Sequence, residues 1–163
     1  MPAQLAAGLL LFRRTSGQTE VLIVHMGGPF WARMDERAWS IPKGEYDETE
    51  VPLAAALREF REELGSPAPD GERIPLGEIR QPKGKRITVY AVEGDFDATT
   101  AHSNTFTLEY PKGSGNVREY PEVDRAEWYD VPTAREKLVK GQVPFLDRLL
   151  EHLDGVTPSR PAG

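Results

Sequence analysis

A helix with two chemically different faces constrains this sequence more than any other feature. Residues 52–64 begin with Pro52, which suits the first turn of a helix, and Gly65 follows them as a suitable C-terminal residue. Their apolar side chains recur at the spacing of a buried stripe, namely Leu53, Leu57, Phe60 and Leu64. Val51 is a poor N-cap residue, so we expect Thr49 or a glutamate to cap the helix. The pattern predicts an amphipathic helix that packs one face against a core.

The opposite face of this helix carries three carboxylates, because Glu59, Glu62 and Glu63 are spaced at i, i+3 and i+4. Like charges this close repel unless a cation relieves them, and hard oxygen ligands suit Mg²⁺ or Mn²⁺ held together with phosphates. Arg58 can pair with Glu59 or Glu62 and so orient a ligand. Glu50, near the helix start, can cap the helix or join the metal site. The alternative interpretation is a solvated, charged helix face without a metal.

The remainder of the chain predicts strands and two further helices. Apolar runs with strand-forming residues occupy residues 5–12, 21–25, 39–42, 74–79, 86–96, 106–110 and 126–129. The first two runs are separated by polar residues and Gly17, which indicates a hairpin with a longish loop. Helical patterns cover residues 132–140 and 144–153. Together these elements indicate one α/β domain with a mixed sheet over residues 1–154, followed by a flexible tail at 155–163.

Composition narrows the classes of function. The length of 163 residues suits one domain, and the net charge of −6 argues against a general nucleic-acid binder. The chain has no cysteine, which excludes a disulfide scaffold, a thiol nucleophile and a Cys-ligated metal, and is compatible with a cytoplasmic protein. No apolar run approaches the roughly 20 residues that cross a bilayer, so no membrane association is expected. Residues 6–12 are read as a strand and not as a signal peptide.

The carboxylates belong to a longer pattern that starts at a glycine. Its defined positions are Gly44, Glu50, Arg58, Glu59, Glu62, Glu63 and Gly65. This spacing resembles the signature of the Nudix hydrolase superfamily over residues 44–66, with one departure, because Ser66 stands at a final position that is usually apolar. The resemblance implies an α/β/α sandwich in which the signature forms a loop–helix–loop. It also implies metal-dependent hydrolysis of compounds in which a nucleoside diphosphate is linked to another group.

The same resemblance implies roles for individual residues. Glu59, Glu62 and Glu63 would be metal ligands, the backbone carbonyl of Lys43 would complete the metal shell, and Arg58 would orient the glutamates. A bound metal neutralises the charge that develops as water attacks phosphorus. A carboxylate or a metal-bound hydroxide takes the proton from that water.

Residues before and after the signature suggest how a substrate is held. The sequence Trp-Ser-Ile-Pro-Lys-Gly at residues 39–44 resembles the diadenosine polyphosphate hydrolase branch, in which the lysine reaches a phosphate; here that residue is Lys43. Trp39 could stack on a base or serve as a core residue. Lys83 and Arg86, with Lys85 between them, could bind a polyphosphate or form the solvated tip of a hairpin.

Further candidates lie outside the signature. Pro82 resembles a marker of ADP-ribose hydrolases, but one proline among 14 says little about substrate. Glu119 and Glu122 precede Trp128 in a predicted loop, where many family members recruit a base. We prefer Glu122 for that role, against the alternative of a solvated loop carboxylate. The lone histidines are expected to be structural or exposed.

The leading hypothesis is a Mg²⁺- or Mn²⁺-dependent hydrolase of phosphoanhydride bonds, with diadenosine polyphosphates or nucleoside triphosphates as substrates. The alternative is a non-catalytic, nucleotide-sensing module on the same fold. An isomerase of the isopentenyl-diphosphate type needs a cysteine, and messenger RNA decapping needs an extended basic surface. The expected partner is a small-molecule nucleotide, without a stable nucleic-acid complex, and the oligomeric state leaves no signature in the sequence.

Overall fold

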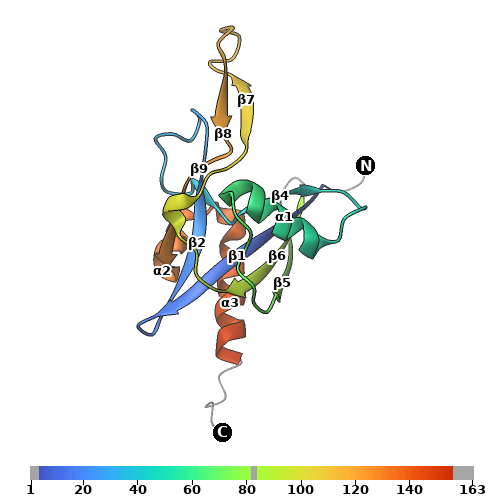
Figure 1. The fold of residues 1–163 in the computed structure, drawn as a ribbon, viewed down its shortest axis with the longest axis vertical. Helices are drawn as coiled ribbons and strands as arrows, with labels where there is room; N and C mark the ends of the chain where they lie inside the picture. Colours follow the sequence, from blue (N-terminus) through green and yellow to red (C-terminus); the bar gives the residue numbers. More distant parts are fainter. Residues whose placement is uncertain (1–3, 82–83, 156–163) are drawn as a thin grey trace.

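A mixed sheet with helices on both of its faces forms the body of the molecule (Figure 1). The computed structural model describes residues 4–81 and 84–155. Within them, the seven strands of the sheet are β1 (Leu5–Thr15), β2 (Gln18–Met26), β3 (Trp39–Ser40), β4 (Lys43–Tyr46), β5 (Ile74–Arg80), β6 (Arg86–Glu93) and β9 (Val123–Asp130). The helices are α1 (Pro52–Leu64), α2 (Val131–Lys137) and α3 (Val143–Gly155), with short 3₁₀ segments η1 (Ala98–Thr100) and η2 (Lys140–Gln142).

Strand β1 organises the sheet because it pairs along both edges. One edge runs parallel to β6, from Leu5 opposite Arg86 onward. The other edge is antiparallel to β4 near its start, where Gly8 lies opposite Lys43, and antiparallel to β2 near its end. β2 in turn pairs with β3 and β9, and β6 pairs with β5. The predicted mixed sheet is therefore confirmed.

The side chains of β1 alternate between two cores. Leu9 and Leu11 pack with helix α1 on one face of the sheet, whereas Leu10 and Phe12 pack with α2 and α3 on the other face. All four are at most 1% exposed. An apolar run without polar interruptions is what a strand covered on both faces requires. The α/β/α architecture that the signature implied follows from these two cores.

Helix α1 has the predicted bounds, but its buried face is rotated from the predicted stripe. Its buried residues are Ala55, Ala56, Glu59, Phe60 and Leu64. Leu53 and Leu57 are only partly buried. The rotation brings a carboxylate to the sheet, and it is possible because the two alanines allow a close approach to the strands beneath them. The periodicity therefore predicts the helix correctly and the centre of its buried face incorrectly.

The N-terminus of α1 differs from the prediction. Across the described ranges, no side chain hydrogen-bonds to the N-terminus of α1 at Val51. The Thr49 hydroxyl donates to Asp47 instead. Glu50 pairs with Arg58, so neither predicted residue caps the helix. Pro52 still favours this end of the helix. Amide hydrogens in the first turn have no acceptor within the helix, and proline, which has no amide hydrogen, leaves one fewer of them unpaired.

The C-terminus of α1 is closed by backbone contacts from a distant segment. Gly65 takes the left-handed conformation, with φ of 80°. The amides of His102 and Asn104 donate to the carbonyls of Leu64 and Glu62 over 3.2 and 3.0 Å. These contacts satisfy carbonyls that a helix end leaves open. They also attach the segment that leads to residue 105 to the end of the carboxylate-bearing helix.

The β1–β2 hairpin and a separate arm were not predicted in full. The hairpin has a two-residue turn instead of a longish loop, because Ser16 and Gly17 both take positive φ and allow a tight turn.

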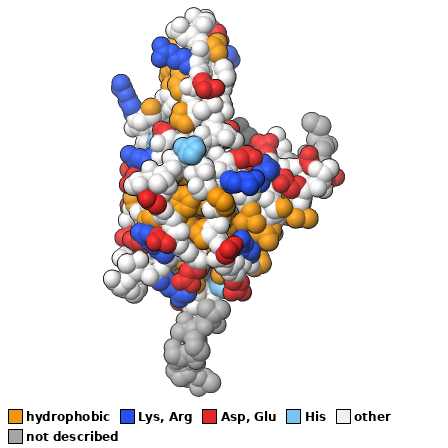
Figure 2. Space-filling model, in the orientation of Figure 1, with side chains coloured by type: hydrophobic (Ala, Val, Ile, Leu, Met, Phe, Trp, Pro, Cys, Tyr) orange, Lys and Arg blue, Asp and Glu red, His pale blue; other side chains and the backbone are white. Residues whose placement is uncertain are grey.

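The arm consists of β7 (Thr105–Glu109) and β8 (Val117–Pro121), which pair with each other. It stands out from the body and carries apolar and charged side chains of both signs (Figure 2). β8 and β4 lack the alternation that would have predicted them.

Among the helices that the structure describes, none is long and apolar enough to span a bilayer.

We expect Gly65→Ala to destabilise the protein more than Gly17→Ala does. Both glycines have φ near 80°, so each substitution costs about 1–2 kcal/mol of backbone strain. A Cβ at Gly65 would also lie 2.5 Å from the His102 ring and 2.7 Å from its carbonyl, whereas nothing lies within 4 Å at Gly17. Urea unfolding should give a free-energy loss roughly 1 kcal/mol larger for Gly65→Ala. Equal losses would contradict the packing of residue 102 on this helix end.

Candidate functional site

The carboxylate of Glu59 lies between helix α1 and strand β4. The Glu59 side chain is buried, and the structure places its carboxylate directly against the backbone of Gly44. A Cβ atom at residue 44 would overlap this carboxylate. Gly44 therefore supplies the space that the Glu59 carboxylate occupies, which gives a physical reason for the glycine that opens the signature.

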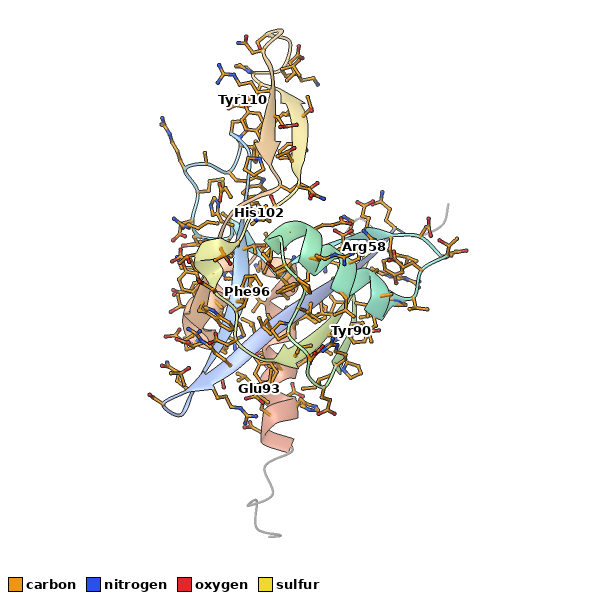
Figure 3. All side chains as sticks on the ribbon, in the orientation of Figure 1. Arg58, Tyr90, Glu93, Phe96, His102 and Tyr110 are labelled. Carbon is orange, nitrogen blue, oxygen red and sulfur yellow. The ribbon has the colours of Figure 1, made fainter. Side chains whose placement is uncertain are left out.

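Arg58 connects the glutamates to the loop that precedes the helix. Its Nη1 donates to Glu59 Oε2 over 2.7 Å and to Glu62 Oε2 over 3.2 Å. Its Nε and Nη2 donate to the two carboxylate oxygens of Glu50, each over 2.9 Å. The bidentate contact lowers the pKa of Glu50. Arg58 lies on the side of α1 that faces β4 (Figure 3), and it holds the glutamates as predicted, with Glu50 as its anchor.

Glu63 is the most strongly perturbed carboxyl group of the site. Burial raises its pKa to about 8, although the nearby Lys43 opposes the shift. The amide of Lys43 donates to Glu63 Oε1 over 3.3 Å. Burial also raises the pKa of Glu59, and the neighbouring Glu62 raises it further. Burial therefore outweighs the contacts with Arg58 and Lys43, and both carboxyl groups hold a proton more tightly than an exposed glutamate does.

Glu122 joins this cluster from the turn between β8 and β9. Its pKa is raised by burial and then by the charge of Glu62. Its carbonyl accepts from the Gly27 amide over 2.9 Å, and a Cβ at Gly27 would collide with the carbonyl of Pro121. Glu119 lies elsewhere, exposed on β8 opposite Thr107. The structure thus brings the preferred glutamate, and not Glu119, to the helix carboxylates.

The donor set fits a divalent cation. Glu59, Glu62 and Glu63 offer oxygen ligands from one helix face, and burial raises the pKa of Glu59 and of Glu63, so a cation bound there would offset the cost of ionising them. In residues 4–81 and 84–155, no three acidic or histidine side chains already surround one point. Two of the three glutamates are instead bridged by Arg58. The Lys43 carbonyl and these three glutamates remain the predicted ligands.

Trp39 is a core residue, so the prediction that it stacks on a base is wrong. Its side chain is fully buried, and Nε1 donates to Asp35 over 2.8 Å. His25 and Tyr129 pack edge-on against the ring, each with a centroid distance of 5.2 Å. His25 is also buried, with its two ring nitrogens 2.7 Å from Asp124 and 2.6 Å from the Met34 carbonyl. A structural role, the alternative for Trp39 and the expectation for His25, is therefore correct for both residues.

The structure describes only some of the basic residues that follow the signature. Lys83 and Pro82 lie outside the described residues. Arg86 starts β6, where its amide donates to the Gln4 carbonyl over 2.8 Å, and it does not line the cavity described below. Lys85, treated only as its neighbour, does line that cavity together with Lys43. The prediction that Arg86 binds substrate has no support from this placement.

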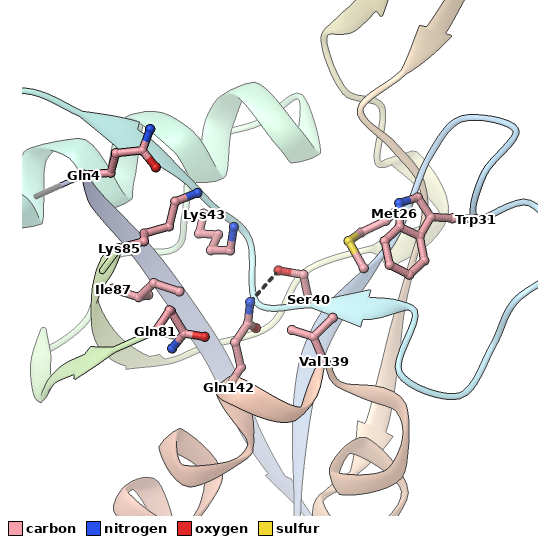
Figure 4. Close-up of a pocket in the computed structure, with 10 residues that line it drawn as sticks. All are labelled: Gln4, Met26, Trp31, Ser40, Lys43, Gln81, Lys85, Ile87, Val139 and Gln142. Atoms are coloured by element: carbon pink, nitrogen blue, oxygen red, sulfur yellow. Dashed lines mark hydrogen bonds between the residues drawn. The ribbon is translucent and has the colours of Figure 1, made fainter. Parts of the chain in front are cut away.

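A cavity of about 480 Å³ opens beside Lys43 (Figure 4). Most of its lining surface is apolar and comes from Met26, Trp31, Ile87 and Val139, and its polar side chains are Lys43, Lys85, one serine and three glutamines. Ligand sites commonly have this size and this mixture of apolar wall and few polar groups. Trp31 was missed by the sequence reasoning because it lies in a loop of mixed residues, where no periodicity marks it.

The comparisons with known proteins identify the family. A family model described as the NUDIX domain matches residues 2–149, and the chain therefore belongs to the Nudix family. The chain is 30% identical over 143 residues to an 8-oxo-(d)GTP phosphatase of Mycolicibacterium smegmatis. That match covers 82% of this chain and 37% of the relative, so the chain spans little more than a third of the relative's length.

Solved structures confirm the fold. The Ap4A hydrolase of C. elegans, in a binary complex, is similar with a TM-score of 0.63 and 21% identity over 93% of this chain and 98% of that one. The NUDIX domain of Shewanella oneidensis NrtR, complexed with ADP ribose, has a TM-score of 0.60 and 17% identity over 94% of this chain and 90% of that one. At these identities the likeness establishes a shared fold.

We expect the metal-free protein to lose stability as the pH rises from about 5 to about 8. Glu63 has an ordinary pKa of 4.5 and a folded-state pKa of about 8, so in this window the folded chain keeps a proton that the unfolded chain releases. The free energy of unfolding therefore falls as the pH rises. Urea unfolding in chelator across this range measures the slope, and Glu63→Gln should flatten it. An unchanged slope in this variant would rule out Glu63 as its origin.

Proposed function

We propose that this chain is a metal-dependent hydrolase that cleaves a phosphoanhydride bond in a nucleoside diphosphate-linked compound. The observation that carries the proposal is the gathering of Glu59, Glu62, Glu63 and Glu122 beside a cavity that Lys43 enters. Membership of the Nudix family supports it, as does the similarity to an 8-oxo-(d)GTP phosphatase, which acts on a nucleotide.

Each residue of the candidate site has its own role in this proposal. Glu59, Glu62, Glu63 and the Lys43 carbonyl would hold Mg²⁺ or Mn²⁺, which when bound stabilises the charge that develops on the attacked phosphate. Arg58, anchored by Glu50, keeps two of the glutamates in place. The Lys43 ammonium binds a phosphate oxygen as a point charge.

Glu122 is the proposed general base. It comes from outside the helix, and its raised pKa makes it a better proton acceptor than an ordinary surface glutamate. Its turn is held by the backbone contact of Gly27 with Glu122 and by a second contact, in which the Glu122 amide donates to Asn104 over 2.9 Å. The carboxylate is thereby positioned near the three helix glutamates without being fixed by Arg58.

Diadenosine polyphosphates or nucleoside triphosphates are the proposed substrates. The Trp-x-x-Pro-Lys-Gly approach at residues 39–44 supports the first, and the triphosphate named for the phosphatase relative supports the second. Both contain a phosphate beyond the one attacked, which the Lys43 ammonium could bind.

The second candidate function is nucleotide sensing without turnover. It is favoured by one observation, that a structural neighbour, the NUDIX domain of NrtR, was solved with ADP ribose. A sensing module has no need of the full set of helix glutamates, all of which are present here. Tight binding of a nucleotide with no metal-dependent cleavage would support sensing in place of hydrolysis.

Phosphate-coupled turnover on a nucleotide panel tests the proposal directly. The panel contains diadenosine tetraphosphate, nucleoside triphosphates including 8-oxo-dGTP, ADP-ribose and nucleotide sugars, each with Mg²⁺, with Mn²⁺ and with chelator. The proposal predicts that one class is cleaved well above the others, and only with metal. No cleavage of any compound by folded, metal-loaded protein would contradict it.

We expect Glu62→Gln to lower kcat by roughly a hundredfold or more, because it removes a charged ligand while leaving the shape of the helix unchanged. Glu119→Gln is the matched control, since it makes the same chemical change on the exposed arm and should leave kcat within about twofold. Thermal unfolding of both variants would show that the fold is intact. Equal activity of the two variants would refute the assignment of Glu62.

A further inference from the structure

The Lys43 side chain places at the cavity an ammonium group without a protein partner in the described parts of the chain. Among the described residues, its ammonium makes no hydrogen bond and no ion pair, although the side chain is partly buried and lines the cavity. The ammonium group of Lys85 lines the same cavity. Two ammonium groups held this close repel each other, and an anion between them would remove that repulsion.

Lys85 provides the second positive charge of the same end of the cavity. Its only ion pair within the described residues is with Glu45, over 3.2 Å, and that carboxylate is largely exposed. An exposed pair of this kind contributes little and can be exchanged for a phosphate. Lys43 also contacts the carboxylate cluster, through its amide and Glu63. The anion-binding end of the cavity therefore adjoins the candidate metal ligands.

The other end of the cavity is apolar and aromatic. Trp31 and Met26 lie across the cavity from Lys43 and Lys85 (Figure 4). In the part of the chain that the structure describes, the indole N–H of Trp31 has no hydrogen-bond partner. An aromatic face and a free donor opposite a pair of ammonium groups match a planar base that is joined to phosphate.

The loop that carries Trp31 is anchored on both sides. At Gly28, whose φ is 95°, a Cβ would lie 3.0 Å from the Phe106 ring, so the arm packs on the start of the loop. Beyond Trp31, the Met34 amide donates to the Trp31 carbonyl over 2.9 Å, and the Met34 carbonyl lies 2.6 Å from His25 Nε2. An aromatic platform that is already held in place loses little freedom when a base stacks on it.

We propose that this cavity is a nucleobase subsite in which Trp31 stacks on the base while Lys43 and Lys85 bind the attached phosphates. The inference rests on the proposed function, because the phosphates would pass from Lys43 to the carboxylate cluster. It assigns Trp31 as a residue that determines specificity for the base. A phosphate-only ligand would not use Trp31, and an uncharged aromatic ligand would not use Lys85.

Binding of ADP and of inorganic pyrophosphate in chelator tests the inference without turnover. Isothermal titration should show that Trp31→Ala weakens ADP binding roughly tenfold or more and leaves pyrophosphate binding unchanged. Lys85→Ala should weaken the binding of both ligands. Trp31→Phe, which keeps an aromatic face, should bind ADP within about threefold of the wild type, and this variant guards against a folding defect in Trp31→Ala.

The matched control is Tyr110→Ala, because Tyr110 is an exposed aromatic residue of the arm that does not line the cavity, whereas the Phe30 ring packs edge-on against Trp31 with a centroid distance of 5.4 Å. It should bind ADP as the wild type does. Unchanged ADP affinity in Trp31→Ala, equal losses in Tyr110→Ala, or no ADP binding by the wild type would overturn the inference. Metal-dependent turnover is scored separately, so a hydrolase without this subsite and a subsite without hydrolysis give different results.

Discussion

Burying an ionised carboxylate is costly, and helix α1 buries Glu59 and partly buries Glu63 against strand β4. The helix can approach the strand because residue 44 is glycine and because two alanines face the sheet. Arg58 compensates part of the charge and is itself held by Glu50. Burial, and then the neighbouring carboxylates, raise the pKa values of Glu59 and Glu63, and the divalent cation that we propose would offset the cost of ionising them. The chemistry of the site is thus a consequence of how closely one helix packs on one strand.

The register of the sheet brings the two lysines of the cavity together. The first four residues of β1 pair with β4 on one edge and with β6 on the other. Lys43 starts β4, and Lys85 directly precedes β6, so both lie near the same end of β1. The amide of Lys43 contacts the carboxylate cluster while its side chain enters the cavity. A single residue therefore joins the proposed cleavage site to the proposed base subsite.

Local patterns predict the parts of this protein that local forces determine. The helix periodicity, the Pro52 start and the Gly65 end give the bounds of α1, and the spacing of its glutamates identifies the carboxylate cluster. Long-range packing decides the rest. The rotation of α1 away from Leu57, the burial of Trp39, and the placement of Trp31 and Lys85 around one cavity depend on contacts between segments far apart in the chain. Neither β4 nor β8 has the alternation that would distinguish a strand from a loop.

The central claim is that the close approach of Glu59 to Gly44 creates a divalent-cation site. Titration of Mn²⁺ into the wild type and Gly44→Ala, followed by the electron paramagnetic resonance signal of free Mn²⁺, tests it most directly. The added Cβ would displace the Glu59 carboxylate, so the variant should bind Mn²⁺ roughly tenfold more weakly or worse. A thermal unfolding scan would check that the variant is folded. Equal Mn²⁺ affinity of folded wild type and variant would contradict the account.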